Sequence, residues 1–395
     1  MPSAPAYAGG VSAPDPSRSS EPAPHLALHA IIPAGGAGTR LWPFSRRSHP
    51  KFLRDVGTGR SLLQETVARL TPVTGGAAAG GVTVVTGVAH EAAVRAQLPE
   101  LPAADLLAEP SPRDSMAAIG LAAAVLERRH GDVVVGSFAA DHLITDVPAF
   151  HAAVRAAVAV AATGKVVTLG ITPTHPATGF GYIHAGDPLH LPGAPTARAV
   201  LGFTEKPDTA TAAGYLATGA FLWNAGMFVA RARVLLDHLA QQRPELRYGI
   251  DRIADAWDTP TRAAALDTHW PTLERIAIDH AIAEPVAAAG GVAVVPADMG
   301  WDDVGDVASL AAHLAPADPT DPTSPRVLGD ASRVHALDAP GAVVLTPGRD
   351  VVVLGIEDAV VIDTPDGLLV TTVAHAQDVK SVVDHLLAAG RTDLL

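Results

Sequence analysis

Residues 34–53 read AGGAGTRLWPFSRRSHPKFL and follow a short apolar run that predicts a buried strand over residues 26–33. Glycines let a backbone come close to phosphate groups and turn its amides toward them. Arginine can bridge two phosphate oxygens, whereas lysine acts as a point charge. The stretch contains glycines and cationic side chains together: Gly35, Gly36, Gly38, Arg40, Arg46 and Lys51. It therefore predicts a loop that cradles a polyphosphate, with mobile positive charge beside it.

Two better-known phosphate loops do not match this stretch. The dinucleotide-binding fingerprint needs a third glycine where Leu41 stands. A Walker loop needs Lys and then Ser or Thr after its last glycine, but Gly38 is followed by Thr39 and Arg40. The glycines alone therefore leave two alternatives open, a phosphate loop and an ordinary turn after a strand.

The composition of the chain limits the classes of function. Nearly half of the 395 residues are apolar, which is enough to bury a large core in two or three domains. The formal net charge of −13 argues against nucleic acid or an anionic membrane surface as a partner. The absence of cysteine excludes disulfides, thiolate metal sites and cysteine nucleophiles.

The sequence shows little sign of a targeting or anchoring segment. No run of about 18 apolar residues predicts a membrane span. Residues 1–26 are rich in Pro, Ala and Ser and lack a basic start followed by an apolar core, so they predict a disordered tail rather than a signal peptide. We therefore expect a cytoplasmic protein.

Strand and helix patterns alternate along the next part of the chain. Strands are expected within residues 81–87, 132–136 and 166–171, and helices over residues 61–70, 116–129 and 149–162. Such alternation predicts a mainly parallel sheet with helices on both faces. In such sheets, ligands bind beyond the carboxyl ends of the strands.

A change in composition marks a second unit. Residues 315–326 are rich in proline and read as a linker. Beyond them, short Val-rich strands alternate with turn signals about every eight to ten residues, as in compact all-β units, and a helix is expected over residues 378–387. We therefore expect a tail over residues 1–26, a catalytic domain over 27–313, a linker over 314–326 and a β domain over 327–395.

The opening stretch resembles the signature of the sugar-nucleotide pyrophosphorylases. GG-x-GTRLWP-x-SR followed by PKFL, with Trp42, is similar to the branch of the mannose-1-phosphate guanylyltransferases. Many members read PKQFL, and this chain lacks that Gln but keeps Lys51. The resemblance implies that Arg40 and Lys51 contact phosphates. It also implies that the loop wraps the triphosphate, with nucleotide contacts from Ala34, Gly35, Gly36, Gly38 and Thr39.

Residues 109–115, EPSPRDS, resemble the family's E-P-x-x-R-N-T loop, which lies beside the base. A carboxylate can accept hydrogen bonds from guanine N1 and from its amine. The resemblance implies that Glu109, Arg113 and Ser115 bind the nucleotide. Asp114 replaces Asn and Ser115 replaces Thr, and either residue can also cap the helix that follows.

Two aspartates are implied to hold Mg²⁺. Residues 139–142, AADH, resemble the family's P-A-D-H, and residues 300–305, GWDDVG, resemble G-W-S-D-V-G. Asp141 and Asp303 match the two metal ligands, and Mg²⁺ favours carboxylate oxygens together with phosphate oxygens. Asp302 stands where the family has a serine, so the choice between Asp302 and Asp303 stays open. Taken alone, each aspartate after a strand is an ordinary cap or turn residue.

Three segments are similar to the family's sugar-binding motifs. They are TGFGYI at residues 178–183, FTEKPD at 203–208 and LWNAGMF at 222–228. The resemblance implies contacts to the sugar phosphate from Gly181, Tyr182, Glu205, Lys206, Asn224 and Gly226. The alternative is a solvated turn at residues 205–206 and a core strand over 222–229. Residues 278–281, IDHA, resemble I-D-Y-A and are given a structural role that orients the site.

Together the motifs imply an α/β fold with a Rossmann-like (GT-A-like) nucleotidyltransferase mixed sheet flanked by helices. They also imply a small C-terminal β-rich domain, similar to a left-handed β-helix, from the weaker match over residues 350–380. The implied reaction converts GTP and α-D-mannose 1-phosphate into GDP-mannose and pyrophosphate with Mg²⁺, and Arg40, Lys51 and Lys206 are the catalytic residues. A homodimer is expected. The alternatives are thymidylyl or adenylyl transfer to glucose 1-phosphate, and a sugar-nucleotide sensor that binds without catalysis.

Overall fold

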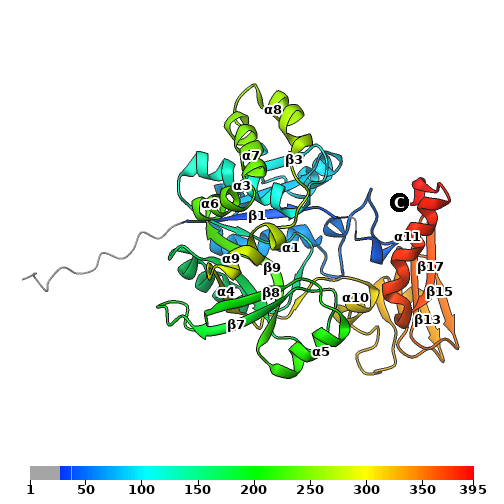
Figure 1. Ribbon diagram of the computed structural model, residues 1–395. Coiled ribbons are helices and arrows are strands. Elements are labelled where there is room, and N and C mark those ends of the chain that lie inside the picture. The colour runs from blue at the N-terminus through cyan, green and yellow to red at the C-terminus, as the bar shows by residue number, and fades with distance from the viewer. Residues whose placement is uncertain (1–26, 37) are drawn as a thin grey trace, which may run out of the picture.

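Two structural units make up the computed structural model, which describes residues 27–36 and 38–395 (Figure 1). An α/β domain contains the first part of the chain, and a smaller β domain packs against one end of it. The tail expected over residues 1–26 lies outside the described residues.

The α/β domain is built on a 9-stranded sheet in the order β3-β2-β1-β4-β9-β6-β10-β8-β7. Strands β1 to β4 run parallel to one another, and β6 runs parallel to β10. The sheet is nevertheless mixed, because β9 runs antiparallel to β4 and β6, and β7 and β8 pair with each other antiparallel. A short connection between β7 and β8 permits only antiparallel pairing. The strands are β1 (Leu28–Ala34), β2 (Val82–Gly87), β3 (Leu106–Glu109), β4 (Val134–Ser137), β6 (Val166–Ile171), β7 (Tyr182–Pro188), β8 (Arg198–Thr204), β9 (Phe221–Arg231) and β10 (Val292–Pro296).

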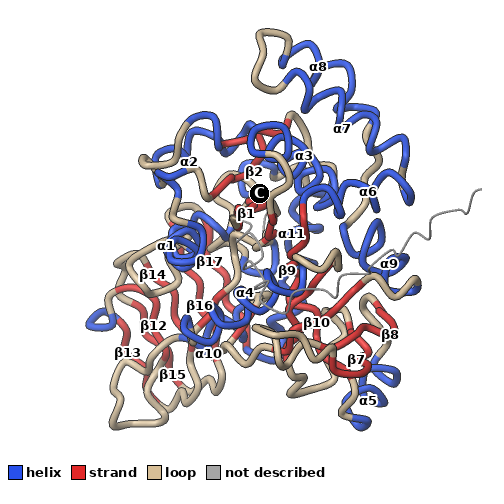
Figure 2. The backbone as a smooth tube through the Cα atoms, turned by 90° about the vertical axis from the view of Figure 1, so that its left-hand side faces the viewer, coloured by secondary structure: helices blue, strands red, loops and turns tan. Residues whose placement is uncertain are grey.

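Helices cover both faces of this sheet (Figure 2). Alternate residues of β1 face opposite sides. Ile32 packs with α1, α2 and α4, whereas Ile31 packs with α3, α6 and α7. The helices are α1 (Leu62–Thr74), α2 (Glu91–Gln97), α3 (Asp114–His130), α4 (Val147–Ala161), α5 (Thr209–Thr218), α6 (Ala232–Gln242), α7 (Pro244–Ala256), α8 (Arg262–His269), α9 (Glu284–Ala288) and α10 (Val307–His313).

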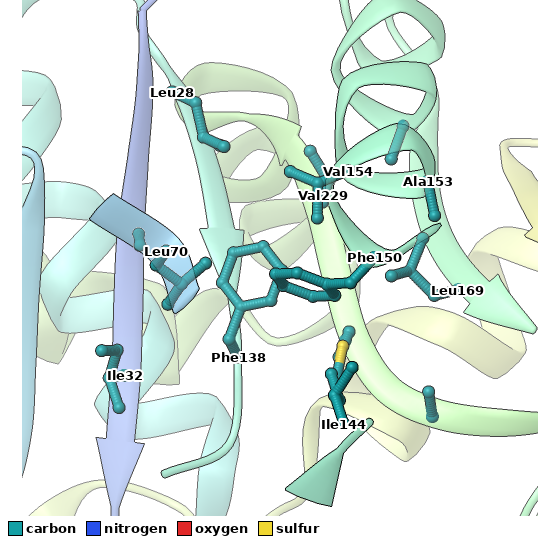
Figure 3. Close-up of a cluster of buried hydrophobic side chains, with 14 of the residues drawn as sticks. Leu28, Ile32, Leu70, Phe138, Ile144, Phe150, Ala153, Val154, Leu169 and Val229 are labelled. Atoms are coloured by element: carbon teal, nitrogen blue, oxygen red, sulfur yellow. The ribbon is translucent and has the colours of Figure 1, made fainter. Parts of the chain in front are cut away.

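An aromatic pair fixes the segment that follows β4. Phe138 lies at the end of β4, and Phe150 comes from α4 (Figure 3). Their ring centroids are 5.8 Å apart at an interplanar angle of 76°. Both side chains are fully buried among aliphatic residues, which include Leu70 and Ile144. This cluster holds residues 138–144, and hence the loop that carries Asp141, in a defined position.

The β domain stacks short strands in two layers. A 4-stranded sheet has the order β12-β14-β16-β17, and a 2-stranded sheet pairs β13 with β15. Arg326, Val343 and Val360 lie in parallel register, so that successive coils of chain stack as in a β-helix. The elements are β12 (Arg326–Gly329), β13 (Val334–Leu337), β14 (Val343–Thr346), β15 (Val351–Leu354), β16 (Ala359–Thr364), β17 (Gly367–Thr372) and α11 (Val379–Ala388).

The two domains share a hydrophobic core that includes the glycine-rich segment. Leu41, Trp42 and Phe44 pack with Leu310 of α10 and with Ile362 of β16. The segment predicted to bind phosphates is thus held between the α/β domain and the β domain.

Candidate active site

The glycine loop and the segment of Lys51 pack so closely that only glycine fits between them. Gly38 has φ 60°, and a Cβ there would lie 2.8 Å from Lys51 Cβ and 2.9 Å from Ser45 Oγ. Ser45 Oγ donates to the Gly38 carbonyl at 2.5 Å. Ala34 ends β1, and Thr39 begins a short 3₁₀-helix, η1 (Thr39–Leu41). The loop therefore leaves the sheet at the carboxyl end of β1, as the sequence predicts.

Lys51 joins three parts of the chain. Its Nζ lies 2.8 Å from Asp141 Oδ2 and donates to the carbonyl oxygens of Asp303 at 2.5 Å and Val304 at 3.4 Å. The short strands β5 (Leu143–Ile144) and β11 (Trp301–Asp302) pair antiparallel and bring the two aspartate loops side by side. All three ammonium donors thus face protein oxygens. Lys51 holds the two aspartate loops together, and its contact with a phosphate remains a prediction.

Asp302 and Asp303 differ in what their carboxylates contact. Asp302 Oδ1 accepts from Val304 N at 2.6 Å and from Ser309 Oγ at 2.5 Å, and its Oδ2 lies 2.9 Å from His313 Nε2. Within the part of the chain that the structure describes, no side chain or amide donates to the Asp303 carboxylate. Asp302 therefore stabilises α10, and Asp303 is the carboxylate that is open to a ligand.

The two aspartates implied to bind metal have opposite pKa shifts. Burial raises the pKa of Asp303, despite the positive charge of Lys51. Burial acts in the same direction on Asp141, but the charges of Lys51 and His142 outweigh it and lower the pKa of Asp141. Two carboxylates in one polar site suit Mg²⁺, which binds one or two carboxylates and takes its other ligands from phosphates and water. Among residues 27–36 and 38–395, no group of three or more His, Cys, Asp or Glu side chains is placed to hold a metal.

A cleft of about 690 Å³ extends from Arg40 and Asp303 to Phe180 and Trp223 of the sugar-side motifs. The ring of Phe180 lies 5.1 Å from that of Trp223 and 5.2 Å from that of Trp301, between centroids. The motifs could not indicate that these aromatic rings line one wall. The cleft is lined by Arg40, Phe180, Trp223, Trp301, Asp303 and Gln377, among others.

The three sugar-side motifs meet around Gly181. A Cβ at Gly181 would lie 2.5 Å from Glu205 Oε2 and 3.4 Å from Asn224 Cβ. Asn224 N donates to the Gly181 carbonyl at 2.8 Å, and Gly226 N donates to Asn224 Oδ1 at 3.1 Å. Thr168 Oγ1 also donates to Asn224 Oδ1, at 2.8 Å. The Asn224 amide oxygen is therefore fixed by the protein.

Asp279 lies in this sugar-side region, although the resemblance implies only an orienting role for it. Asn224 Nδ2 donates to Asp279 Oδ1 at 2.8 Å. Burial, together with the nearby charge of Glu205, raises the pKa of Asp279 to about 6. Lys206 forms an ion pair with Glu205, and its side chain is 62% exposed. Two carboxylates and one ammonium group thus lie close to Gly181 and Asn224.

Tyr182 does not face the site, contrary to expectation. It is fully buried in the core, and its ring centroid lies 5.4 Å from that of Tyr215. Side chains alternate along a strand, so a close approach at Gly181 turns the next residue toward the core. Its hydroxyl is buried and has no hydrogen-bond partner in the described structure.

The segment expected beside the base is arranged around Glu109. This residue ends β3, and its Oε1 is buried with no hydrogen-bond partner among the described residues. Burial raises the pKa of Glu109 to about 7. A buried carboxylate oxygen without a donor is suited to accept a hydrogen bond from an N–H group on the edge of a base.

Arg113 and Ser115 hold a neighbouring loop instead of facing outward. Arg113 donates to the carbonyls of Pro271 at 2.6 Å and Leu273 at 3.0 Å, and Ser115 Oγ accepts from Ile278 N at 2.9 Å. The expected helix cap is also wrong, because α3 begins at Asp114 without a side-chain cap. Both residues therefore support the loop beside Glu109, and their direct contact with a nucleotide remains a prediction.

Arg46 is not the mobile cation that the sequence suggested. It is 7% exposed and donates to Asp366 at 2.5 and 2.7 Å and to Thr364 Oγ1 at 3.0 Å. Both partners belong to the β domain. The Arg46 guanidinium therefore links the α/β domain to the β domain.

Comparison with known proteins agrees with this arrangement. Residues 29–316 match the family model described as nucleotidyl transferase, and residues 332–386 match a mannose-phosphate isomerase/GMP-like β-helix domain. The xanthan biosynthesis protein XanB of Xanthomonas campestris is 40% identical over 92% of this chain and 74% of its own length. The mannose-1-phosphate guanylyltransferase of Escherichia coli K12 is 34% identical over the same shares. This chain belongs to the mannose-1-phosphate guanylyltransferase family.

Membership of the guanylyltransferase family confirms the resemblance and the fold class expected from the sequence. The crystal structure of a mannose-1-phosphate geranyltransferase from Thermus thermophilus superposes with a TM-score of 0.78 at 29% identity, over 91% of this chain and 99% of that one. As in that family, a nucleotidyltransferase domain is followed by a β-helix-like domain. None of the described helices is long and apolar enough to cross a bilayer.

Proposed function

We propose that this guanylyltransferase-family chain transfers GMP from GTP to α-D-mannose 1-phosphate and forms GDP-mannose and pyrophosphate. The observation that carries the proposal is the 34% identity to the E. coli mannose-1-phosphate guanylyltransferase over 92% of this chain. The site geometry supports it, because the glycine loop and the loops of Asp141 and Asp303 meet at Lys51, and Arg40 and Asp303 line one cleft with Phe180 and Trp223 of the sugar motifs. A cytoplasmic location is part of the proposal.

The reaction is an in-line displacement at the α-phosphorus of GTP. A phosphate oxygen of the sugar forms the new P–O bond, and the bond to the β-phosphate oxygen breaks as pyrophosphate leaves. The attacking phosphate is already ionised at neutral pH, so no general base is needed. Catalysis then comes from positioning the two substrates and from neutralising charge.

Each end of the site has a defined task in this reaction. The amides of the glycine loop and Arg40 bind the β- and γ-phosphates, and Lys51 keeps Asp141 and Asp303 beside them. Lys206 binds the phosphate of the sugar, and Glu205 accepts from its hydroxyls. The free carboxylate of Glu109 accepts from guanine N1 and from its amine, because both are donors.

Asp141 and Asp303 are the residues that would hold a divalent cation such as Mg²⁺. When bound, the cation supplies charge neutralisation on the phosphates. The protein's own part is to keep both carboxylates in place, which it does through Lys51 and the pairing of β5 with β11.

Turnover of the purified chain with a panel of nucleoside triphosphates and sugar 1-phosphates tests the proposal. We expect GTP with mannose 1-phosphate to release pyrophosphate fastest. Faster release with thymidine or adenosine triphosphate and glucose 1-phosphate would overturn the specificity. Binding of GDP-mannose without pyrophosphate-dependent cleavage would indicate a sensor.

Three substitutions test the residues themselves. Lys51→Ala, Lys206→Ala and Asp141→Ala should each reduce turnover about 10²- to 10³-fold, as expected when one charged contact is lost from a closed site. Lys380→Ala, on the exposed side of α11, is the control and should act like the wild type. Near-normal turnover in all three variants, with the fold verified by circular dichroism, would show that the site is placed wrongly.

A homodimer is also part of the proposal. Four of the exposed large apolar side chains of the β domain lie on β15 and β17: Val352, Leu354, Leu368 and Val370. Apolar surface gathered on one small domain supports an association between copies. Light scattering after gel filtration would give the mass, and a monomer at micromolar concentration would overturn this part.

A further inference from the structure

The side chain of Gln377 links the β domain to the cleft. Gln377 belongs to the 3₁₀-helix η9 (Val373–Asp378), between β17 and α11. Its Oε1 accepts from Arg40 Nη1 at 3.1 Å, and its Nε2 donates to Asp306 Oδ2. Arginine only donates and a carboxylate only accepts, so the two partners fix which way the carboxamide points.

Asp306 is itself held firmly. It is 7% exposed and caps α10, with its Oδ1 accepting from Ser309 N at 2.9 Å. The loop that leads from β11 to α10 carries both Asp303 and Asp306, and all of these groups line the same cleft. Gln377 therefore connects Arg40 to the loop that presents the Asp303 carboxylate.

Arg40 depends on this contact for its position. Within residues 27–36 and 38–395, Gln377 is the only hydrogen-bond partner of the Arg40 guanidinium, and no carboxylate forms an ion pair with it. An unrestrained arginine side chain samples many rotamers and loses that freedom when it binds a ligand. A neutral acceptor restrains the guanidinium and leaves its charge available.

Other contacts anchor the same segment to the same domain. Trp42 Nε1 donates to the Leu394 carbonyl at 2.8 Å, and Arg46 binds Asp366. These contacts hold the segment that follows η1 against parts of the β domain that precede and follow η9 in the chain. Gln377 is exposed and adds a third contact between the same two segments.

We propose that Gln377 is a positioning residue for GMP transfer, which holds the Arg40 guanidinium in the cleft where the phosphates of the nucleotide bind. The β domain thus completes the triphosphate end of the site. This inference rests on the proposed function, in which Arg40 binds GTP. The neutral carboxamide is essential to the role, because a carboxylate at this position would pair with Arg40, compete with the phosphates and repel Asp306.

A double-mutant cycle on the full-length chain tests the proposal. Calorimetry gives the Kd for GTP of the wild type, Gln377→Ala, Arg40→Ala and the double variant, and kinetics give KM for both substrates. We expect Gln377→Ala to weaken GTP binding about 10-fold, the loss of one hydrogen bond to a charged group, while KM for mannose 1-phosphate stays within about twofold. The double variant should bind no more weakly than Arg40→Ala, because Gln377 acts through Arg40. Gln377→Glu should lose more affinity than Gln377→Ala.

The control and the contrary outcomes separate this role from others. His375→Ala changes an exposed side chain of η9 whose only hydrogen-bond partner among the described residues is Asp378, and the variant should bind GTP like the wild type. Wild-type affinity in Gln377→Ala beside a weakened Arg40→Ala would overturn the proposal, and so would losses that multiply in the double variant. Equal increases of both KM values with a lower melting temperature would show a purely structural role. If the wild type binds GTP but transfers nothing to mannose 1-phosphate, the proposed function fails while the binding cycle still decides on Gln377.

Discussion

Replacement of Gly181 by alanine tests the sugar end of the site through sterics alone. A Cβ at this position would lie 2.5 Å from Glu205 Oε2 and 3.1 Å from Phe203 Cε1. The backbone of Gly181 is not in the left-handed region, so alanine adds no strain of its own there. The Glu205 carboxylate has to move away, and Lys206 moves with it because the two side chains are paired.

The size of the effect follows from the contact that is lost. A hydrogen bond from a sugar hydroxyl to a carboxylate contributes about 1.5–3 kcal/mol. Losing it should lower kcat/KM for mannose 1-phosphate about 10- to 100-fold. KM for GTP should stay within about twofold, because the groups that a Cβ at Gly181 would meet are the sugar-side residues Glu205, Phe203 and Asn224. Pyrophosphate release at saturating GTP, with mannose 1-phosphate varied, measures both quantities.

Gly202→Ala is the matched control. Gly202 lies on β8, the strand that leads to Glu205, and a Cβ there would meet nothing within 4 Å. We expect wild-type kinetics from this variant. The reasoning is refuted if Gly181→Ala and Gly202→Ala behave alike, or if Gly181→Ala raises KM for GTP as much as it raises KM for the sugar phosphate.

Three further predictions concern the base, the domain contact and the core. Burial raises the pKa of Glu109 to about 7, so the accepting carboxylate is lost on acidification, and kcat/KM for GTP should fall between about pH 8 and pH 6. Glu109→Gln should abolish that dependence, and a persistent acidic limb would speak against Glu109. Arg46→Ala removes the hydrogen bonds to Asp366, whose side chain is 55% exposed, and should lower the free energy of unfolding in urea by about 1.5–3 kcal/mol; a change below about 1 kcal/mol would contradict this. Tyr182→Phe removes an unpartnered buried hydroxyl, so the melting temperature should be equal or higher and activity unchanged. A large loss of activity would instead indicate that Tyr182 takes part in binding the sugar phosphate.

Local patterns were sufficient for most elements of the α/β domain. The strand predicted over residues 166–171 is β6 (Val166–Ile171), and the helix predicted over 149–162 is α4 (Val147–Ala161). In both segments, the spacing of apolar residues is regular and the residues at which the segment ends are easy to recognise. The position of β9 between β4 and β6 could not be predicted in this way, because strand order depends on partners far away in the chain. The domain boundaries at residues 314 and 326 remain predictions.

Motifs predicted which residues form the site but not where each side chain points. Gly181 and Tyr182 stand next to each other in one motif, yet Gly181 lies against Glu205 and Asn224 and Tyr182 lies in the core, because neighbouring residues of a strand face opposite sides. Arg46 stands in the phosphate signature but contacts Asp366, more than 300 residues further along the chain. No local pattern contains that information. Gln377 was missed for the same reason.

The direction of the pKa shift distinguishes carboxylates that the protein itself compensates from carboxylates that lack donors. Burial acts to raise the pKa of Asp302, but hydrogen bonds from His313 and Ser309 outweigh it and lower the pKa. Asp302 is therefore already compensated by the protein itself.

Glu109, Asp279 and Asp303 show the opposite behaviour. Their pKa values are raised, with burial as the largest cause in each. Glu109 lies in the segment expected beside the base, Asp279 contacts the sugar-side residue Asn224, and Asp303 lines the cleft with Arg40. A buried carboxylate without enough donors destabilises the folded chain, and the amine of a base, the hydroxyls of a sugar and a cation are the groups that offset this cost. Asp141 differs because Lys51 already supplies the compensating charge. The same reasoning favours Asp303 over its neighbour Asp302 as the proposed ligand of a cation.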